Sequence, residues 1–159
     1  QLYRPSAALP GTPDLVFVRC DEAFDRAGIY GERAVDFADN ARRFAVLCHA
    51  ALHALRGRAG GTPAILHAHD WHAALAPLYL RTTYAHDPAL RGVASVLTVH
   101  NAAFQQHLSA EDIGALGLPA ELYDWRCLEW YGRANLLKGA LAVADHVTTV
   151  SPTHAEELC

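Results

Sequence analysis

The sequence contains no run of eighteen or more apolar residues, and its N-terminus lacks the charged, apolar and small-residue order of a secretory signal peptide. Its 13 basic residues are outnumbered by 17 acidic ones and do not cluster. A nucleic acid or an anionic membrane attracts clustered Lys and Arg, so neither is expected as a partner. These absences predict a protein of the aqueous phase.

Cysteine is scarce. The four residues of this type are Cys20, Cys48, Cys127 and Cys159, and they lie far apart with no CxxC spacing. The spacing excludes a zinc site built from paired cysteines and a dense disulfide framework. A reducing cytoplasm is therefore the expected location.

The chain does have enough apolar material for one domain, since 52% of its 159 residues are hydrophobic. It begins with Gln1 instead of Met, and Cys159 falls inside a run that predicts the opening of a helix. We expect both ends to be cut, so that residues 1–159 form one partial domain.

Short apolar runs alternate with helical patterns along most of the sequence. The runs are almost continuously apolar, which is typical of a parallel sheet with helices on both faces. The alternation favours strands joined by crossover helices, and the sequence therefore predicts an α/β fold with a Rossmann-like parallel sheet. Strands are expected at 15–18, 64–67, 93–99 and 146–150, and helices from Asp36 to just before Gly57, at 71–84, at 134–144 and from Pro152 onward.

Ser151 lies directly before the last of these helices. Pro152 suits the first helical position, and the Ser151 hydroxyl is placed to accept from free N–H groups of the first turn. Val150 and Pro152 do not give Ser151 the GxSxG setting of a hydrolase nucleophile. We expect Ser151 to be a helix cap.

Polar side chains follow two of the predicted strands. The segment 67–72, His-Ala-His-Asp-Trp-His, follows the strand that begins at Ala64, and His100 and Asn101 follow Val99. Because ligands of open α/β sheets bind beyond the carboxyl ends of the strands, both segments are candidates for a binding site.

Three histidines, His67, His69 and His72, invite a metal-site hypothesis, with Asp70 as a carboxylate ligand. In strand conformation His67 and His69 share one face, whereas His72 already lies in the next helix. A second interpretation is that the histidines bond backbone carbonyls and that Asp70 caps the helix. Capping leaves Asp70 able to contact a ligand as well.

Each of the remaining candidates also has two interpretations. Trp71 is either a core residue or an aromatic platform for a sugar, because its ring lies between Asp70 and His72 at a strand-to-helix turn. His100 and Asn101 are either structural or part of a site, since both side chains can donate and accept hydrogen bonds after a wholly apolar strand.

A series of longer motifs runs along the sequence: FDRAGIYG at 24–31, DNARRF at 39–44, HAHDWHA at 67–73, LTVHN at 97–101, LEWYG at 128–132, NLLKG at 135–139 and ADHVTTVSPT at 144–153. In residues, order and spacing these motifs closely resemble those of bacterial glycogen synthases and plant starch synthases. The resemblance covers about residues 15–159.

The resemblance implies the N-terminal part of a GT-B glycosyltransferase, in which two Rossmann-like domains face a cleft. It implies a metal-independent transfer of glucose, with retention, from ADP-glucose to the non-reducing end of an α-1,4-glucan such as glycogen or starch. No cofactor beyond the nucleotide sugar is implied. By position, His100 resembles the histidine beside the donor glucose, where it stabilises positive charge at the anomeric centre. Asp70, Trp71, His72 and Asn101 resemble residues of the same pocket. The location implied is the cytoplasm, or the plastid for a plant member.

Several parts of the family's pattern are not found in the sequence. The donor-binding loop and first strand, expected upstream, and the C-terminal Rossmann-like domain, expected downstream, lie outside residues 1–159. Ala27 stands where the family commonly has proline, and Gln106 stands where glycine is expected after Phe104 and Gln105. We therefore expect the isolated chain to lack transferase activity.

Two other classes of function stay open on the sequence. A metal-dependent hydrolase would use the histidines at 67, 69 and 72. A non-catalytic glucan-binding or interaction domain would bind maltooligosaccharide without transferring glucose.

Overall fold

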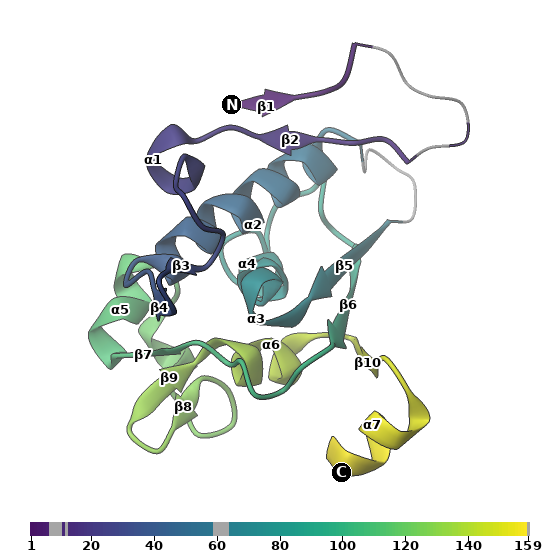
Figure 1. The fold of residues 1–159 in the computed structure, drawn as a ribbon. Coiled ribbons are helices and arrows are strands. Elements are labelled where there is room, and N and C mark those ends of the chain that lie inside the picture. The colour runs from purple at the N-terminus through teal and green to yellow at the C-terminus, as the bar shows by residue number, and fades with distance from the viewer. Residues whose placement is uncertain (7–10, 12, 59–63, 159) are drawn as a thin grey trace.

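The computed structural model describes residues 1–6, 11, 13–58 and 64–158, and Figure 1 shows their arrangement. Three strands form a sheet in the order β10-β6-β5: β5 (Ile65–His69), β6 (Ala94–Val99) and β10 (His146–Thr149). All neighbouring strands are parallel, and His69 lies opposite Thr98. The predicted α/β class with a parallel sheet is confirmed.

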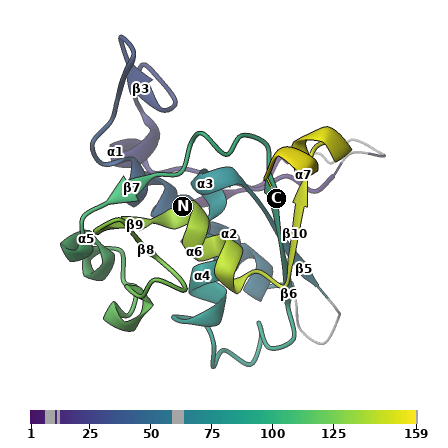
Figure 2. The same cartoon turned by 90° about the horizontal axis from the view of Figure 1, so that it is seen from below.

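Helices cover one face of this sheet. Figure 2 shows α2 (Asn40–Arg56), α4 (Leu75–Arg81) and α6 (Leu136–Val143) on the same side of the three strands. Alternate side chains of the strands, such as Leu66 and Leu97, join these helices in one buried core. The sequence predicted helices on both faces. Among the described residues no helix covers the opposite face at β5, where His67 and His69 are exposed and Ile65 is 66% exposed.

A break divides the predicted helix 71–84 into α3 (Asp70–Ala73) and α4. In a continuous helix the N–H of residue 77 would donate to the carbonyl of Ala73. Pro77 has no N–H, so this bond is absent at the junction. The interruption ends the short helix that carries Trp71 and His72, immediately after β5.

The stretch between β6 and α6 holds more regular structure than the sequence indicated. A capping box formed by Ser109 and Asp112 starts its helix, and Asn135 caps α6 by accepting from the Lys138 N–H at 2.9 Å. Its elements are β7 (His107–Leu108), α5 (Ala110–Ala115), the 3-10 helix η1 (Ala120–Leu122), β8 (Glu129–Trp130) and β9 (Arg133–Asn135), with the strands in the antiparallel order β7-β9-β8.

The N-terminal segment forms two small hairpins and one short helix. The predicted buried strand 15–18 was wrong in its burial, because Phe17 is 57% exposed and pairs only in a separate two-stranded sheet. The elements are β1 (Leu2–Tyr3), β2 (Phe17–Val18), α1 (Asp21–Phe24), β3 (Gly31–Glu32) and β4 (Val35–Asp36).

At the other end of the chain, α7 (Pro152–Leu158) follows β10 directly. The His154 N–H donates to the Ser151 hydroxyl at 3.1 Å, which confirms Ser151 as a helix cap. Within the ranges that the structure describes, every helix is too short or too polar to cross a membrane.

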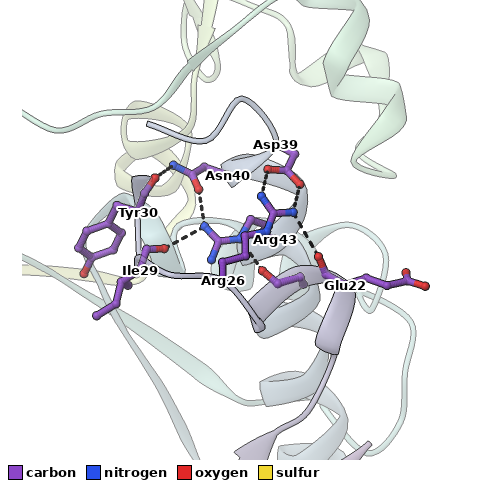
Figure 3. Close-up of polar contacts among 8 residues, drawn as sticks. Glu22, Arg26, Ile29, Tyr30, Asp39, Asn40 and Arg43 are labelled. Carbon is purple, nitrogen blue, oxygen red and sulfur yellow. Dashed lines mark hydrogen bonds and ion pairs between the residues drawn. The ribbon is translucent and has the colours of Figure 1, made fainter. Parts of the chain in front are cut away.

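One buried cation organises the loop between α1 and α2. Arg43 is only 3% exposed. Its Nε donates to the Ala23 carbonyl at 2.6 Å. One terminal nitrogen donates to the Ile29 carbonyl at 2.9 Å and to the Asn40 Oδ1 at 2.6 Å (Figure 3). The ring of Phe37 lies 4.9 Å below its guanidinium. Arg43 therefore fixes the backbone of residues 23–29.

Replacing Arg43 with Met should lower the free energy of unfolding by about 2–4 kcal/mol, because three acceptors lose their donor and two of these hydrogen bonds, to Ala23 and Asn40, are buried. Arg42→Met is the matched control, since Arg42 is exposed on the same helix. Its effect should stay within about 0.5 kcal/mol. Urea unfolding followed by circular dichroism measures both, and equal losses would show that the buried contacts contribute nothing.

Asp145 joins the start of β10 to β6 and α4. Its Oδ2 accepts from the backbone N–H of Ser95 at 2.7 Å and from the Ser95 hydroxyl at 2.9 Å, and it pairs with Arg81. These donors, the Ser95 N–H first, hold the pKa of Asp145 below its ordinary value of 3.8. Ionised Asp145 therefore stabilises the fold, and its protonation removes that stabilisation.

The stability difference between the wild type and Asp145→Asn should depend on pH in one direction. A carboxyl whose pKa is lower in the folded state stabilises fully above its unfolded pKa and loses this effect as pH falls through its folded pKa. The variant should be less stable at pH 7, and the gap should begin to narrow at about pH 4 and close as the pH falls through the lower pKa of the folded state. Thermal melts across pH 2.5–7 measure it, and a gap independent of pH would contradict the assignment.

Candidate functional site at the carboxyl edge of the sheet

Parallel pairing brings the two predicted segments together at one edge of the sheet. Asp70 directly follows β5, and its Oδ1 accepts from the backbone N–H of His100 at 2.7 Å and of Asn101 at 3.4 Å. A single carboxylate thus ties the end of β5 to the turn after β6. Among the hydrogen bonds of the described part of the chain, both bonds to the Asp70 carboxylate go to Oδ1 and none goes to Oδ2.

The helix-capping interpretation of Asp70 is wrong. The residue at the N-cap of α3 is His69, and its side chain makes no capping bond. Asp70 instead has a backbone φ of 57°, in the left-handed region that Asp and Asn tolerate better than most side chains. This conformation turns the chain sharply between strand and helix and directs the carboxylate towards the neighbouring turn.

His100 and Asn101 lie exposed at this junction. The His100 Nε2 is 3.0 Å from the His69 Nδ1, and the Asn101 Oδ1 accepts from the Ala103 N–H at 2.9 Å. The asparagine therefore shapes its own turn, as side chains of this type often do. The structure places Asp70, His100 and Asn101 within one cluster, as the sequence predicted.

Trp71 and His72 line an adjacent cavity of about 410 Å³. Trp71 is 6% exposed and meets Phe44 edge-on, with ring centres 5.1 Å apart, so it is a core residue as well as a wall of the cavity. The His72 ring lies 4.7 Å from that of Tyr30, and burial lowers the pKa of His72. The other lining residues are Asp36, Ala103, Phe104, Gln105, Gln106 and His107. Aromatic walls with a polar rim suit a carbohydrate.

Tyr30 and Asp36 are site residues that sequence reasoning missed. The Asn40 side chain donates to the Tyr30 carbonyl at 2.7 Å, so the Arg43 network reaches the cavity (Figure 3). At Gly28 an added Cβ would lie 1.9 Å from the Gly31 carbonyl oxygen, which restricts this tight turn to glycine. Tyr30 lies within the FDRAGIYG motif, but the motif alone gave no reason to choose it, and Asp36 lies outside that motif.

Gln106 adopts a left-handed backbone conformation with φ 54°. Glycine takes this conformation without steric cost, whereas other residues pay roughly 1–2 kcal/mol. The departure from the expected glycine is therefore a strained position on the cavity wall. The other departure, Ala27, lies exposed in the turn before Gly28.

The metal-site interpretation finds no geometry to support it. The His67 Nε2 is 2.7 Å from the Thr98 hydroxyl, His69 contacts His100, and His72 packs among aromatic rings. Among residues 1–6, 11, 13–58 and 64–158, no three His, Cys, Asp or Glu side chains converge on a metal-sized position.

Burial raises the pKa of the Cys48 thiol to about 12, which keeps the thiol protonated and makes it a poor nucleophile.

Fold and site together define an α/β protein with a cluster of polar side chains at the carboxyl edge of a parallel sheet, the place where open α/β sheets bind ligands. A sequence profile described as "Starch synthase catalytic domain" matches residues 6–159. The chain belongs to the starch synthase catalytic domain family.

Curated relatives agree with this assignment. The chain is 45% identical to a glycogen synthase of Anaeromyxobacter sp. (strain K) over 149 residues, which are 93% of this chain and 31% of the relative. It is 42% identical to glycogen synthase 2 of Geobacter sulfurreducens, over 96% of this chain and 31% of the relative. The chain thus spans about a third of the length of the curated relatives it matches.

A solved structure confirms the fold. The catalytic domain of starch synthase IV from Arabidopsis thaliana, bound to ADP and acarbose, matches with a TM-score of 0.70 at 34% identity. The match covers 84% of this chain and 26% of that one. The GT-B α/β class expected from the sequence is thereby confirmed.

The two hydrogen bonds that the Asp70 carboxylate accepts from the backbone N–H groups of His100 and Asn101, here called the Asp70 clamp, can be tested without any substrate. Asp70→Ala removes the acceptor and should speed amide hydrogen exchange at His100 and Asn101 about tenfold. Asp70→Asn keeps an oxygen at Oδ1 and tolerates the left-handed backbone, so exchange should stay near that of the wild type. Residue-resolved NMR measures the rates. Unchanged exchange in Asp70→Ala would show that the Asp70 carboxylate does not protect these two amides.

Proposed function

We propose that the protein carrying this chain is a retaining glucosyltransferase that moves glucose from ADP-glucose to the non-reducing end of an α-1,4-glucan. In this reaction the bond between the anomeric carbon and the diphosphate oxygen breaks, and a bond to the acceptor hydroxyl oxygen forms. The hydroxyl proton leaves with ADP as the other product. Glycogen or starch is the acceptor, and the cytoplasm, or a plastid in a plant, is the location.

The observation that carries the proposal is the junction of Asp70 with the turn at His100 and Asn101. It lies where open α/β sheets bind ligands, and it offers a carboxyl oxygen, an imidazole and a carboxamide for sugar hydroxyls. The family assignment supports the choice of reaction. The ADP and acarbose bound to the Arabidopsis relative support a nucleotide and a glucan as the two partners.

Within this proposal His100 lies beside the donor glucose. Positive charge develops at the anomeric carbon as the diphosphate departs, and an oriented polar group fixed nearby stabilises it without reorganising. The clamp from Asp70 holds the backbone of His100 in place before the sugar arrives. Asp70 and Asn101 bind sugar hydroxyls from the same edge.

The cavity beside Trp71 and His72 is proposed to hold the glucan. Its aromatic rings, with Tyr30 on one wall, offer faces for the apolar sides of sugar rings, while Asp36 and Gln105 on its rim bond hydroxyls. With a volume of about 410 Å³ the cavity is of the size of small-ligand sites. A binding module without catalysis would share this cavity, but it would give no role to the clamped turn at His100.

His100→Ala in a full-length protein that carries this chain should lower kcat by about 10²–10³-fold, because it removes a group that acts mainly in the transition state. The release of ADP from ADP-glucose with glycogen as primer measures the rate. His53→Ala is the control, since His53 is exposed on α2, away from the sheet edge. Near-wild-type turnover of His100→Ala would remove His100 from the proposed mechanism.

A further inference from the structure

The imidazole of His69 is the side-chain neighbour of His100. His69 is the last residue of β5 and His100 directly follows the neighbouring parallel strand β6. Because His69 lies opposite Thr98, the side chain two residues after Thr98 emerges on the same face. The His69 Nδ1 lies 3.0 Å from the His100 Nε2, with the ring centres 5.2 Å apart. The separation between the nitrogens is that of a hydrogen bond.

A hydrogen bond between two ring nitrogens needs one proton between them. A neutral imidazole carries one N–H and one lone pair, so the bond assigns opposite roles to Nδ1 of His69 and Nε2 of His100. It also fixes the rotation of the His100 ring about its side-chain bonds. Both features decide which nitrogen His100 presents to a ligand.

His69 is itself held in place. Its ring centre lies 4.3 Å from that of His67, and the His67 Nε2 is 2.7 Å from the Thr98 hydroxyl. Thr98 in turn shares a 2.7 Å hydrogen bond with Thr148 on β10. This row of polar side chains crosses all three strands and leads to His100.

The groups that face His69 favour its neutral form. Burial, followed by the neighbouring His67 and His100, lowers the pKa of His69, and Asp70 opposes these effects. A neutral ring can share a single proton with His100, whereas two charged rings would repel each other.

We propose that His69 is a positioning residue that sets the ring orientation and tautomer of His100 through the Nδ1–Nε2 hydrogen bond. The inference rests on the proposed role of His100 in glucosyl transfer. It gives His69 a role different from the metal ligand or backbone-bonded histidine that the sequence suggested, and it explains why the face of the sheet opposite the helices carries a polar row.

The test uses full-length protein and compares two amides at position 69. Asn places its amide near the position of Nδ1, so His69→Asn should keep at least a third of the wild-type kcat. Gln places its amide one bond further out, so His69→Gln, like His69→Ala, should lower kcat about 10–100-fold. KM for ADP-glucose should change less than about threefold in all three variants, because a positioning defect acts on the transition state.

A double variant separates this inference from the proposed function. With ADP release as the measure, His69→Ala combined with His100→Ala should be no slower than His100→Ala alone, because His69 acts only through His100. Additive losses would overturn the inference, as would wild-type turnover in His69→Ala or equal rates for the Asn and Gln variants. Wild-type turnover in His100→Ala would instead overturn the proposed function, whatever the variants at position 69 do.

Discussion

Parallel pairing of β5 with β6 is the constraint on which the site depends, because it ends both strands at the same edge of the sheet. The register sets His69 opposite Thr98, so β5 and β6 end within one residue of each other, and the Asp70 carboxylate reaches the backbone N–H of His100 just after β6. A shift of one residue would turn His69 towards the helices and bring Leu66 to the exposed face. The buried core on the helical side thus enforces the geometry of the polar side.

A second constraint acts from the other wall of the cavity. Arg43 is buried in α2 and bonds the carbonyls of the loop before it, and Asn40 carries the same network to the backbone of Tyr30. A cation in this position is stable only because its hydrogen bonds and the surrounding aromatic rings compensate for lost hydration. The position of Tyr30 against His72 is therefore determined by core packing, although the loop itself lies at the surface.

Much of this architecture could be predicted from the sequence, because local signals specify it. Continuous apolar runs located β5, β6 and β10, and Ser151 with Pro152 located the start of α7. The site residues Asp70, His100 and Asn101 followed from their place after strands. Contacts between distant segments left no local signal: the Asp70 carboxylate bonds the turn after β6, and Arg43 bonds carbonyls 14 and 20 residues away. The split between α3 and α4 does have a local signal, the missing N–H of Pro77, which the prediction of one helix over 71–84 did not use. The small strands β7 to β9 were missed because tertiary pairing decides such short elements.

We propose that this chain is the sugar-facing part of a larger transferase, and it spans about a third of the length of the curated relatives it matches. Transfer of labelled glucose from ADP-glucose to glycogen tests that claim most directly, with the chain alone and a full-length protein that carries it assayed side by side. The full-length protein should incorporate label into glycogen, and the chain alone should incorporate none above background. No incorporation by the full-length protein, or comparable incorporation by the chain alone, would contradict the account.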